Sequence, residues 1–323
     1  MPAVLLTDRM WEGWVQPIAQ LFTDAGWTIV HSKYKYPLTS AQIREQLTGV
    51  HAFMSNDRDA VTAEAFAGAD ALKVISRTGV GFDNVDVAAA ARQGVAVTIT
   101  PGANAETVAD MVFGLMLGLG RQIAYADRRM RVGMWGQIDN REAWKKTLAI
   151  VGFGRVGQAV ARRARGFAMR VLAVEPFPDP AAVASAGVTL VDLETALREA
   201  DFVTLHAPAT PDAHKLINAT TLALMKPTAY LINTARGQLV DEEALYEALL
   251  AERIAGAALD VWDPEPPDTK SPLLVLDSVI ATPHIAGNSL ESRTRMGVMA
   301  VENCINALAG RLSPDVVVNG VQL

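Results

Sequence analysis

The chain has 323 residues, of which 50% are hydrophobic and 20% are charged, and its formal net charge is −6. This composition can supply a large core and excludes extensive disorder, and the length is typical of about two domains. The negative net charge argues against nucleic acid or an anionic membrane as a partner. The single cysteine, Cys304, excludes an intrachain disulfide.

The N-terminal sequence lacks a cationic stretch followed by a long apolar stretch, a pattern that predicts no secretory signal. The longest apolar run, Met111–Gly120, is too short to cross a bilayer. We therefore predict a soluble protein of the cytoplasm.

The first hundred residues alternate short apolar segments with segments of helical pattern. The predicted strands are Ala3–Leu6, Thr28–Val30, Ala52–Met54 and Val74–Ser76, and the predicted helices are Val15–Ala25 and Ser40–Leu47. This alternation is typical of a parallel sheet covered by helices.

A helix over Thr107–Leu119 follows, and it is apolar nearly all round, which predicts burial between domains. The later part of the chain contains four more segments with the pattern of buried strands, a loop rich in proline and acid, and a last helix. These are Phe202–Leu205, Tyr230–Asn233, Ala257–Val261 and Val279–Ala281, then the loop Asp263–Pro272 and the helix Glu291–Ala309.

Three glycines stand between a predicted strand, Thr147–Val151, and a predicted helix, Val156–Ala164. In a dinucleotide-binding turn, Gly152 would permit the sharp turn, Gly154 would let the backbone approach a pyrophosphate, and Gly157 would allow close packing of helix and strand. The N-terminus of the helix would offer free N–H groups to the phosphates. The spacing alone is weak evidence, but its position between a strand and a helix predicts a dinucleotide site.

Glu175 strengthens this prediction, because it ends a second apolar strand, Met169–Val174, eighteen residues after Gly157. A carboxylate at this place accepts hydrogen bonds from the adenosine ribose and repels a 2′-phosphate. The sequence therefore predicts NAD as the cofactor in preference to NADP.

Polar residues follow the strands of the second half of the chain. They are His206 to Pro208, Thr234 to Gly237, Asp260 with Glu265, and Pro283 with His284. Because ligands bind beyond the carboxyl ends of the strands in an open parallel sheet, we expect these residues to share one crevice with the nicotinamide.

These residue types suit hydride transfer between nicotinamide and C2 of a 2-hydroxy or 2-oxo acid. Arg236 can bind the substrate carboxylate and polarise the C2 oxygen. His284 can give or take the C2 hydroxyl proton, and Glu265 can orient the imidazole and raise its pKa. Simpler interpretations compete, since Arg236 could form a surface ion pair, Glu265 could be an ordinary loop acid, and Asp260 could cap a helix or loop.

The ordered motifs of the chain resemble those of the D-isomer-specific 2-hydroxyacid dehydrogenases, in particular the branch similar to phosphoglycerate dehydrogenase. The resemblance covers nearly the whole chain, and its motifs are Thr78–Asp86, Thr100–Asn104, Gly152–Gly157, His206–Pro208, Ile232–Gly237, Leu259–Pro266 and Thr282–Gly287.

The resemblance implies an α/β protein with two doubly wound parallel-sheet domains. A Rossmann NAD-binding domain, residues 102–288, would be inserted into a flavodoxin-like catalytic domain formed by residues 1–101 and 289–323. It also implies a homodimer joined through the cofactor domain.

The resemblance further implies site residues. The catalytic set would be Arg236, Glu265 and His284, and no metal is expected. The cofactor would contact Gly152, Gly154, Arg155, Val156, Gly157, Glu175, His206, Pro208, Thr234, Ala235, Asp260 and Gly287. The substrate would contact the backbone amides of Val80 and Gly81, together with Asn104.

One departure from the family pattern concerns the substrate. Relatives specific for phosphoglycerate carry an arginine where Asn56 stands here, and Arg58 is close but shifted. Asn56 is thus a candidate substrate contact that puts phosphate recognition in doubt. Met10 and Trp11 are candidates for an apolar pocket around the substrate tail.

The leading hypothesis is an NAD-dependent D-2-hydroxyacid dehydrogenase that acts most readily as a 2-oxoacid reductase. A rival of another class is an NAD-sensing, corepressor-like binding protein on the same fold. Phosphoglycerate and phosphite remain open as specific substrates. Formate is disfavoured, because formate dehydrogenases that resemble this chain usually have glutamine where Glu265 stands.

Overall fold

The computed structural model describes residues 1–7 and 15–323 of the chain. The polypeptide forms two compact units, one made of Met1–Asn104 with Ser289–Leu323 and the other of Ala105–Asn288. We call them the terminal unit and the inserted unit. Met10 and Trp11, the candidates for a substrate-tail pocket, lie outside the described residues.

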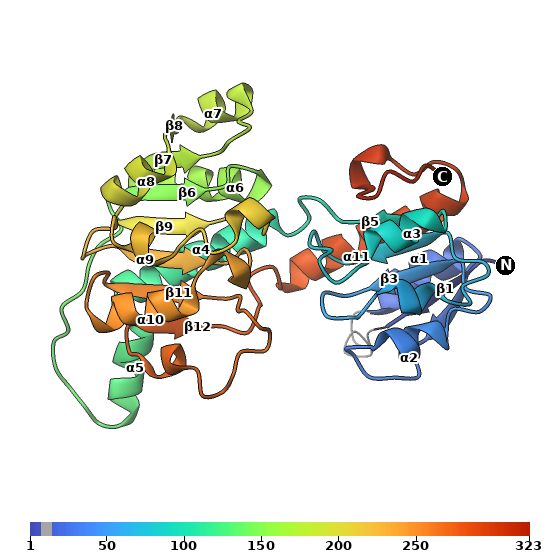
Figure 1. Cartoon of the computed structure of the whole chain (residues 1–323), viewed down its shortest axis with the longest axis horizontal. Coiled ribbons are helices and arrows are strands. Elements are labelled where there is room, and N and C mark those ends of the chain that lie inside the picture. Colours follow the sequence, from blue (N-terminus) through green and yellow to red (C-terminus); the bar gives the residue numbers. More distant parts are fainter. Residues whose placement is uncertain (8–14) are drawn as a thin grey trace. The chain divides into compact units, whose positions relative to one another are not determined.

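The terminal unit is built on a five-stranded parallel sheet with the order β2-β1-β3-β4-β5 (Figure 1). Its elements are β1 (Ala3–Leu6), α1 (Val15–Asp24), β2 (Thr28–His31), α2 (Ser40–Arg44), β3 (Ala52–Ser55), β4 (Val74–Arg77), α3 (Val87–Arg92), β5 (Ala96–Thr98) and α11 (Leu290–Leu308).

The alternation of side chains along these strands creates one core on each face of the sheet. Leu5, Phe53 and Ile75 point to one face, where α2 and α3 cover them. Val4 and Met54 point to the other face, where α1 and α11 cover them. Both faces are buried, which is why these strands read as continuous apolar segments.

The inserted unit is built on a seven-stranded parallel sheet with the order β12-β11-β10-β9-β6-β7-β8. In Figure 1 it runs from β12 at its lower edge to β8 at its upper edge. The strands are β6 (Thr147–Val151), β7 (Arg170–Val174), β8 (Thr189–Leu190), β9 (Phe202–Leu205), β10 (Tyr230–Asn233), β11 (Gly256–Leu259) and β12 (Val279–Ala281).

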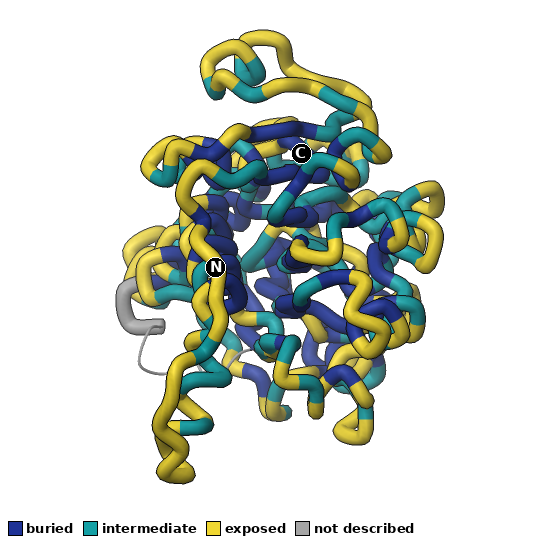
Figure 2. The backbone as a smooth tube through the Cα atoms, turned by 90° about the vertical axis from the view of Figure 1, so that its left-hand side faces the viewer, coloured by how far each residue is buried: buried dark blue, intermediate teal, exposed yellow. Residues whose placement is uncertain are grey.

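Helices cover both faces of this sheet. Leu148 and Ile150 pack with α4 and α6 on one face, and Ala149 and Val151 pack with α8, α9 and α10 on the other. Figure 2 shows the resulting pattern of buried strands and exposed loops. The helices are α4 (Ala105–Gly120), α5 (Ile123–Arg131), α6 (Arg155–Ala164), α7 (Pro180–Ala186), α8 (Leu193–Glu199), α9 (Ala219–Leu222) and α10 (Glu242–Leu250).

The predicted fold class is confirmed, since both sheets are parallel and the strand order of each reverses once, beside β1 and beside β6. The helix predicted over residues 107–119 is α4, and it packs on α6 and on β10–β12 of its own unit. The helix predicted to reach Leu47 ends at Arg44, because the chain tightens there and Gln46 N bonds to Ile43 O. The sequence analysis did not predict the helices α3, α5, α7, α8, α9 and α10, nor the strands β5 and β8.

In the part of the chain that the structure describes, no helix has the length and the apolar character needed to cross a membrane.

Candidate active site

The glycine-rich turn after β6 is a place of close backbone contact. Gly152 has φ +94°, and a Cβ there would lie 2.6 Å from the carbonyl carbon of His206. A Cβ on Gly157 would lie 2.3 Å from the Gly152 oxygen, whereas a Cβ on Gly154 would meet no atom within 4 Å. Gly152 and Gly157 are therefore required by the fold, and Gly154 leaves an open cradle at the N-terminus of α6.

Arg155 and Val156 begin α6, so the first turn of this ten-residue helix faces the same cradle as Gly154. Glu175 follows β7 directly. Its carboxylate accepts the N–H of Phe153 at 2.8 Å and that of Phe177 at 3.1 Å. The carboxylate thus lies against the turn, where the sequence predicts an adenosine ribose.

His206 follows β9 and touches the turn from the other side. Its N–H donates to Val151 O at 2.7 Å, and its Nε2 lies 3.0 Å from the Thr204 hydroxyl. Burial lowers the pKa of His206 to about 3, so the imidazole is neutral at physiological pH. Pro208, two residues on, is exposed.

The turn after β10 carries Arg236. Asn233, which is fully buried, accepts the Ala235 N–H at 3.0 Å and donates its amide N–H to Arg236 O at 2.8 Å. Arg236 Nη1 donates to Ala235 O at 2.7 Å. The turn is therefore fixed by the amide of Asn233, a residue that the sequence analysis did not single out although it is a polar side chain at the end of a buried strand.

The Thr234 hydroxyl oxygen in this turn is buried and has no hydrogen-bond partner among residues 1–7 and 15–323. Buried polar groups are normally hydrogen-bonded, so this oxygen has capacity for a ligand group.

Gly237, which follows Arg236, brings the segment after β10 into contact with the segment after β11. A Cβ on Gly237 would lie 2.1 Å from the carbonyl carbon of Trp262 and 2.6 Å from Asp263 N. Glu242, at the start of α10, also accepts the Asp263 N–H at 3.0 Å. The turn that carries Arg236 and the loop that carries Glu265 are thus packed backbone to backbone.

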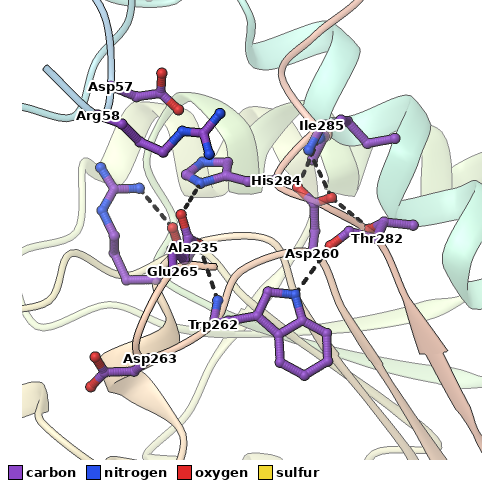
Figure 3. Close-up of polar contacts among 12 residues, drawn as sticks. Asp57, Arg58, Ala235, Asp260, Trp262, Asp263, Glu265, Thr282, His284 and Ile285 are labelled. Carbon is purple, nitrogen blue, oxygen red and sulfur yellow. Dashed lines mark hydrogen bonds and ion pairs between the residues drawn. The ribbon is translucent and has the colours of Figure 1, made fainter. Parts of the chain in front are cut away.

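Asp260 directly follows β11, and its side chain is fully buried. One carboxylate oxygen accepts the Thr282 hydroxyl at 2.5 Å and the Ile285 N–H at 2.9 Å, and the other accepts the Ala286 N–H at 2.7 Å (Figure 3). His284 N also donates to Asp260 O at 2.7 Å. These bonds hold the loop after β12, in which His284 has φ +55° and which continues to Gly287.

Glu265 and His284 form a direct pair, drawn in Figure 3. His284 Nδ1 lies 2.8 Å from Glu265 Oε2, while Glu265 Oε1 accepts the Trp262 N–H at 3.0 Å. The Trp262 indole N–H donates to Thr282 O at 3.1 Å, which ties the two loops together. The imidazole is 36% exposed, so it is accessible to a substrate.

The predicted substrate contacts belong to the terminal unit. Val80 and Gly81 lie in the loop after β4, and Asn104 is the last residue before the inserted unit. The Asn56 amide N–H donates to the Thr7 hydroxyl at 3.1 Å. Its oxygen accepts from the Thr78 hydroxyl at 2.8 Å, so the Asn56 side chain holds two segments of this unit together.

Comparison with known proteins identifies one family of dehydrogenases. A sequence model described as D-isomer specific 2-hydroxyacid dehydrogenase, NAD binding domain, matches residues 113–286. The chain is 39% identical to a glyoxylate reductase of Korarchaeum cryptofilum, over 98% of this chain and 96% of that protein.

The chain is also 39% identical to a D-3-phosphoglycerate dehydrogenase of Methanocaldococcus jannaschii, over 87% of this chain, but it spans only 54% of that longer protein. A solved structure of D-lactate dehydrogenase from Aquifex aeolicus, complexed with NAD and lactic acid, is similar with a TM-score of 0.82 and 27% identity, over 99% of both chains.

Three features of the inserted unit fit a bound NAD. The cradle at Gly154 is open, the Glu175 carboxylate lies beside it, and the Thr234 hydroxyl oxygen has no hydrogen-bond partner among the described residues. A bound dinucleotide supplies the nicotinamide ring that gives or accepts a hydride.

We predict different effects for alanine at the three glycines. Gly152→Ala and Gly157→Ala should each lower the free energy of unfolding by roughly 2–4 kcal/mol, because the new Cβ overlaps backbone atoms. Gly154→Ala should change stability by less than about 0.5 kcal/mol but should weaken NADH binding at least about tenfold, because its Cβ occupies the cradle. Urea denaturation and NADH fluorescence titration measure the two effects. A Gly154→Ala protein with unchanged NADH affinity would contradict this assignment.

We also predict a pH-dependent contribution of His206 to stability. Its pKa is lowered to about 3 in the folded protein, below the value of about 6.5 in an unfolded chain. The contribution is therefore complete above about pH 6.5 and is lost as the pH falls, by at most about 1.4 kcal/mol per unit. The stability difference between the wild type and His206→Gln should shrink between pH 7 and pH 5 in urea denaturation. His31→Gln, at an exposed position, is the control, and a His206→Gln difference that changes with pH no more than the difference for this control would refute the prediction.

Proposed function

Because the chain belongs to the D-isomer specific 2-hydroxyacid dehydrogenase family and is an NAD-dependent oxidoreductase, we propose that it reduces short 2-oxo acids to D-2-hydroxy acids with NADH. The observation that carries the proposal is the Glu265–His284 pair, 2.8 Å apart, beside the turn of Arg236. Similar proteins named glyoxylate reductase and hydroxypyruvate reductase support substrates of two or three carbons.

His284 acts as the acid in this proposal. A carboxylate can only accept hydrogen bonds, so contact with Glu265 requires that Nδ1 carries a proton. Proton transfer to the C2 oxygen of the substrate then falls to Nε2. Glu265 stabilises the imidazolium form and fixes the orientation of the ring.

Arg236 binds the carboxylate of the substrate and polarises the C2 carbonyl, using the planar donor fork of its guanidinium. Its turn is fixed by Asn233 and by the contact of Gly237 with Trp262. We propose that the amides of Val80 and Gly81, with Asn104, bind the substrate in the terminal unit. The Asn56 side chain, which bridges Thr7 and Thr78, shapes that region.

The cofactor preference of the proposal is for NADH over NADPH. Glu175 places a carboxylate beside the glycine-rich turn, where it would repel a 2′-phosphate and accept hydrogen bonds from a ribose. The remaining residues of the proposed cofactor environment are Arg155, Val156, His206, Pro208, Ala235, Asp260 and Gly287. Among them, Asp260 acts indirectly, by holding the loop that carries His284.

We further propose that the protein is a homodimer joined through the inserted unit. The segment that contains α5 and the residues after it, which we call the arm (residues 121–144), carries large apolar side chains that are more than half exposed. They are Ile123, Met130, Val132, Met134, Trp135 and Trp144. Apolar side chains gathered in this way are typical of a protein–protein interface.

We predict that His284→Ala reduces kcat for glyoxylate by about 10²- to 10⁴-fold, because general acid catalysis is lost, while NADH affinity stays within about threefold. Arg236→Ala should lower kcat and raise KM, because its interactions form in both the ground and transition states. The assay is NADH oxidation, with hydroxypyruvate and 3-phosphohydroxypyruvate as further substrates. Near-normal turnover by His284→Ala would overturn its role as the acid.

We predict that the double variant Val132→Ser, Trp135→Ser is monomeric, because it removes the two most exposed apolar side chains of the arm, which are 72% and 87% exposed. Light scattering should give twice the chain mass of 34.6 kDa for the wild type and a single chain mass for the variant. Phe177→Ser, at a 90% exposed position outside the arm, is the matched control. A variant that stays dimeric would exclude the arm as the interface.

A further inference from the structure

The terminal unit contains a buried arginine that the mechanism above does not use. Arg77 is the last residue of β4 and is only 2% exposed. An arginine is rarely buried unless it is paired, because removing its charge from water is costly. Its partners therefore indicate what the burial achieves.

The guanidinium of Arg77 is directed at the loop after β4. Nε and Nη2 both donate to the Gly81 carbonyl oxygen, at 2.9 and 2.8 Å, and Nη1 donates to Ser55 O at 3.1 Å. One edge of the guanidinium thus holds a single carbonyl group with two hydrogen bonds, and a third bond fixes the arginine to the end of β3.

A buried carboxylate, Asp59, balances this charge. It is fully buried and accepts the N–H groups of Leu38 and Asn56 and the hydroxyl of Thr7, at 2.9 to 3.0 Å. Burial raises the pKa of Asp59, and Arg77 acts in the opposite direction. The electrostatic attraction of Asp59 therefore adds to the hydrogen bonds that hold the guanidinium.

Two anchored carbonyls determine where the loop amides point. The Gly79 oxygen accepts the Thr100 N–H at 2.9 Å, and the Gly81 oxygen accepts from Arg77. Across a trans peptide, the C=O of one residue and the N–H of the next point in opposite directions. The N–H groups of Val80 and Phe82 consequently point away from the anchors, and both residues lie at the surface, 41% and 37% exposed.

We propose that Arg77 is a positioning residue for a carboxylate-binding loop, Thr78–Phe82, and that the Phe82 amide is a further donor to the substrate carboxylate. This inference rests on the proposed function, which places the substrate carboxylate at this loop. A positive charge on the Gly81 carbonyl polarises the peptide group, so the Phe82 N–H on its far side becomes a stronger donor to an anion. The ligand is a small 2-oxo or 2-hydroxy carboxylate.

The test compares Arg77→Met, Arg77→Lys and the control Arg92→Met, which removes an exposed arginine of the same unit. Oxamate, a 2-oxo-acid analogue that is not reduced, is titrated into the NADH-loaded protein, and kcat and KM are measured with glyoxylate. In Arg77→Met, the oxamate Kd and the glyoxylate KM should rise about 30-fold, while kcat and NADH affinity change less than about threefold. Arg77→Lys keeps the charge but not the planar donor fork, so its oxamate Kd and glyoxylate KM should lie between those of the wild type and Arg77→Met. Arg92→Met should match the wild type.

Unchanged oxamate affinity in a folded Arg77→Met protein would overturn the inference. If this variant does not fold, the wild type decides: in a ¹⁵N-labelled, NADH-loaded sample, oxamate should shift the Val80 and Phe82 amide resonances saturably, and constant resonances would refute the proposal. A wild type that binds oxamate through these amides but reduces no 2-oxo acid would instead contradict the proposed function alone.

Discussion

Backbone-to-backbone contact at the carboxyl edge of the seven-stranded sheet is the constraint on which the inserted unit depends. A parallel sheet places the carboxyl end of every strand at one edge, where the segments that follow the strands crowd together. Gly152 against His206, Gly157 against Gly152, and Gly237 against Trp262 are approaches that a Cβ would prevent. The first two shape the cofactor turn, and the third joins the turn of Arg236 to the loop of Glu265. The spacing of the groups that we propose to react therefore follows from the absence of a side chain at these glycines.

Buried polar groups then fix the loops that glycine brings together. Asp260 is saturated by three donors from the loop of His284, and Asn233 brackets the turn of Arg236. In the terminal unit, Arg77 does the same for the loop after β4, and Asp59 does so for the segment after β3. Such groups are costly to bury unless every bond is made, so each one favours a single arrangement of its loop. The groups proposed to react remain more exposed than the groups that hold them.

Each unit contains its own set of groups for one part of the proposed reaction. The inserted unit holds the proposed cofactor cradle, the Glu265–His284 pair and Arg236, and the terminal unit holds a loop with two amides directed at the surface. The neutral, partly buried His206 adds no charge to the proposed cofactor side, so the charge there comes from Glu175, Arg155 and the N-terminus of α6. Variants at the glycine-rich turn should therefore alter NADH binding, whereas carboxylate binding should depend on Arg236 of the inserted unit and on the loop after β4 of the terminal unit.

The sequence by itself determined the fold class, the glycine turn with Glu175, and the order of polar residues after the strands, because strand burial and turn chemistry are local properties of the chain. It did not reveal the roles of Asn233 or Arg77. For Asp260 it left open a cap of a helix or loop and a contact with the cofactor, and the structure shows the carboxylate bonded to the loop of His284. It also missed α3, α5, α7, α8, α9 and α10, whose patterns are short or mixed. Of these helices, α3, α8, α9 and α10 are stabilised by packing on a sheet, whereas α5 and α7 bury no residue. The roles of Arg77 and Asp260 depend on partners far away in the chain, namely Ser55 for Arg77 and residues 282–286 for Asp260. Only the tertiary structure decided them, because a hydrogen bond between distant segments leaves no periodic trace in either one.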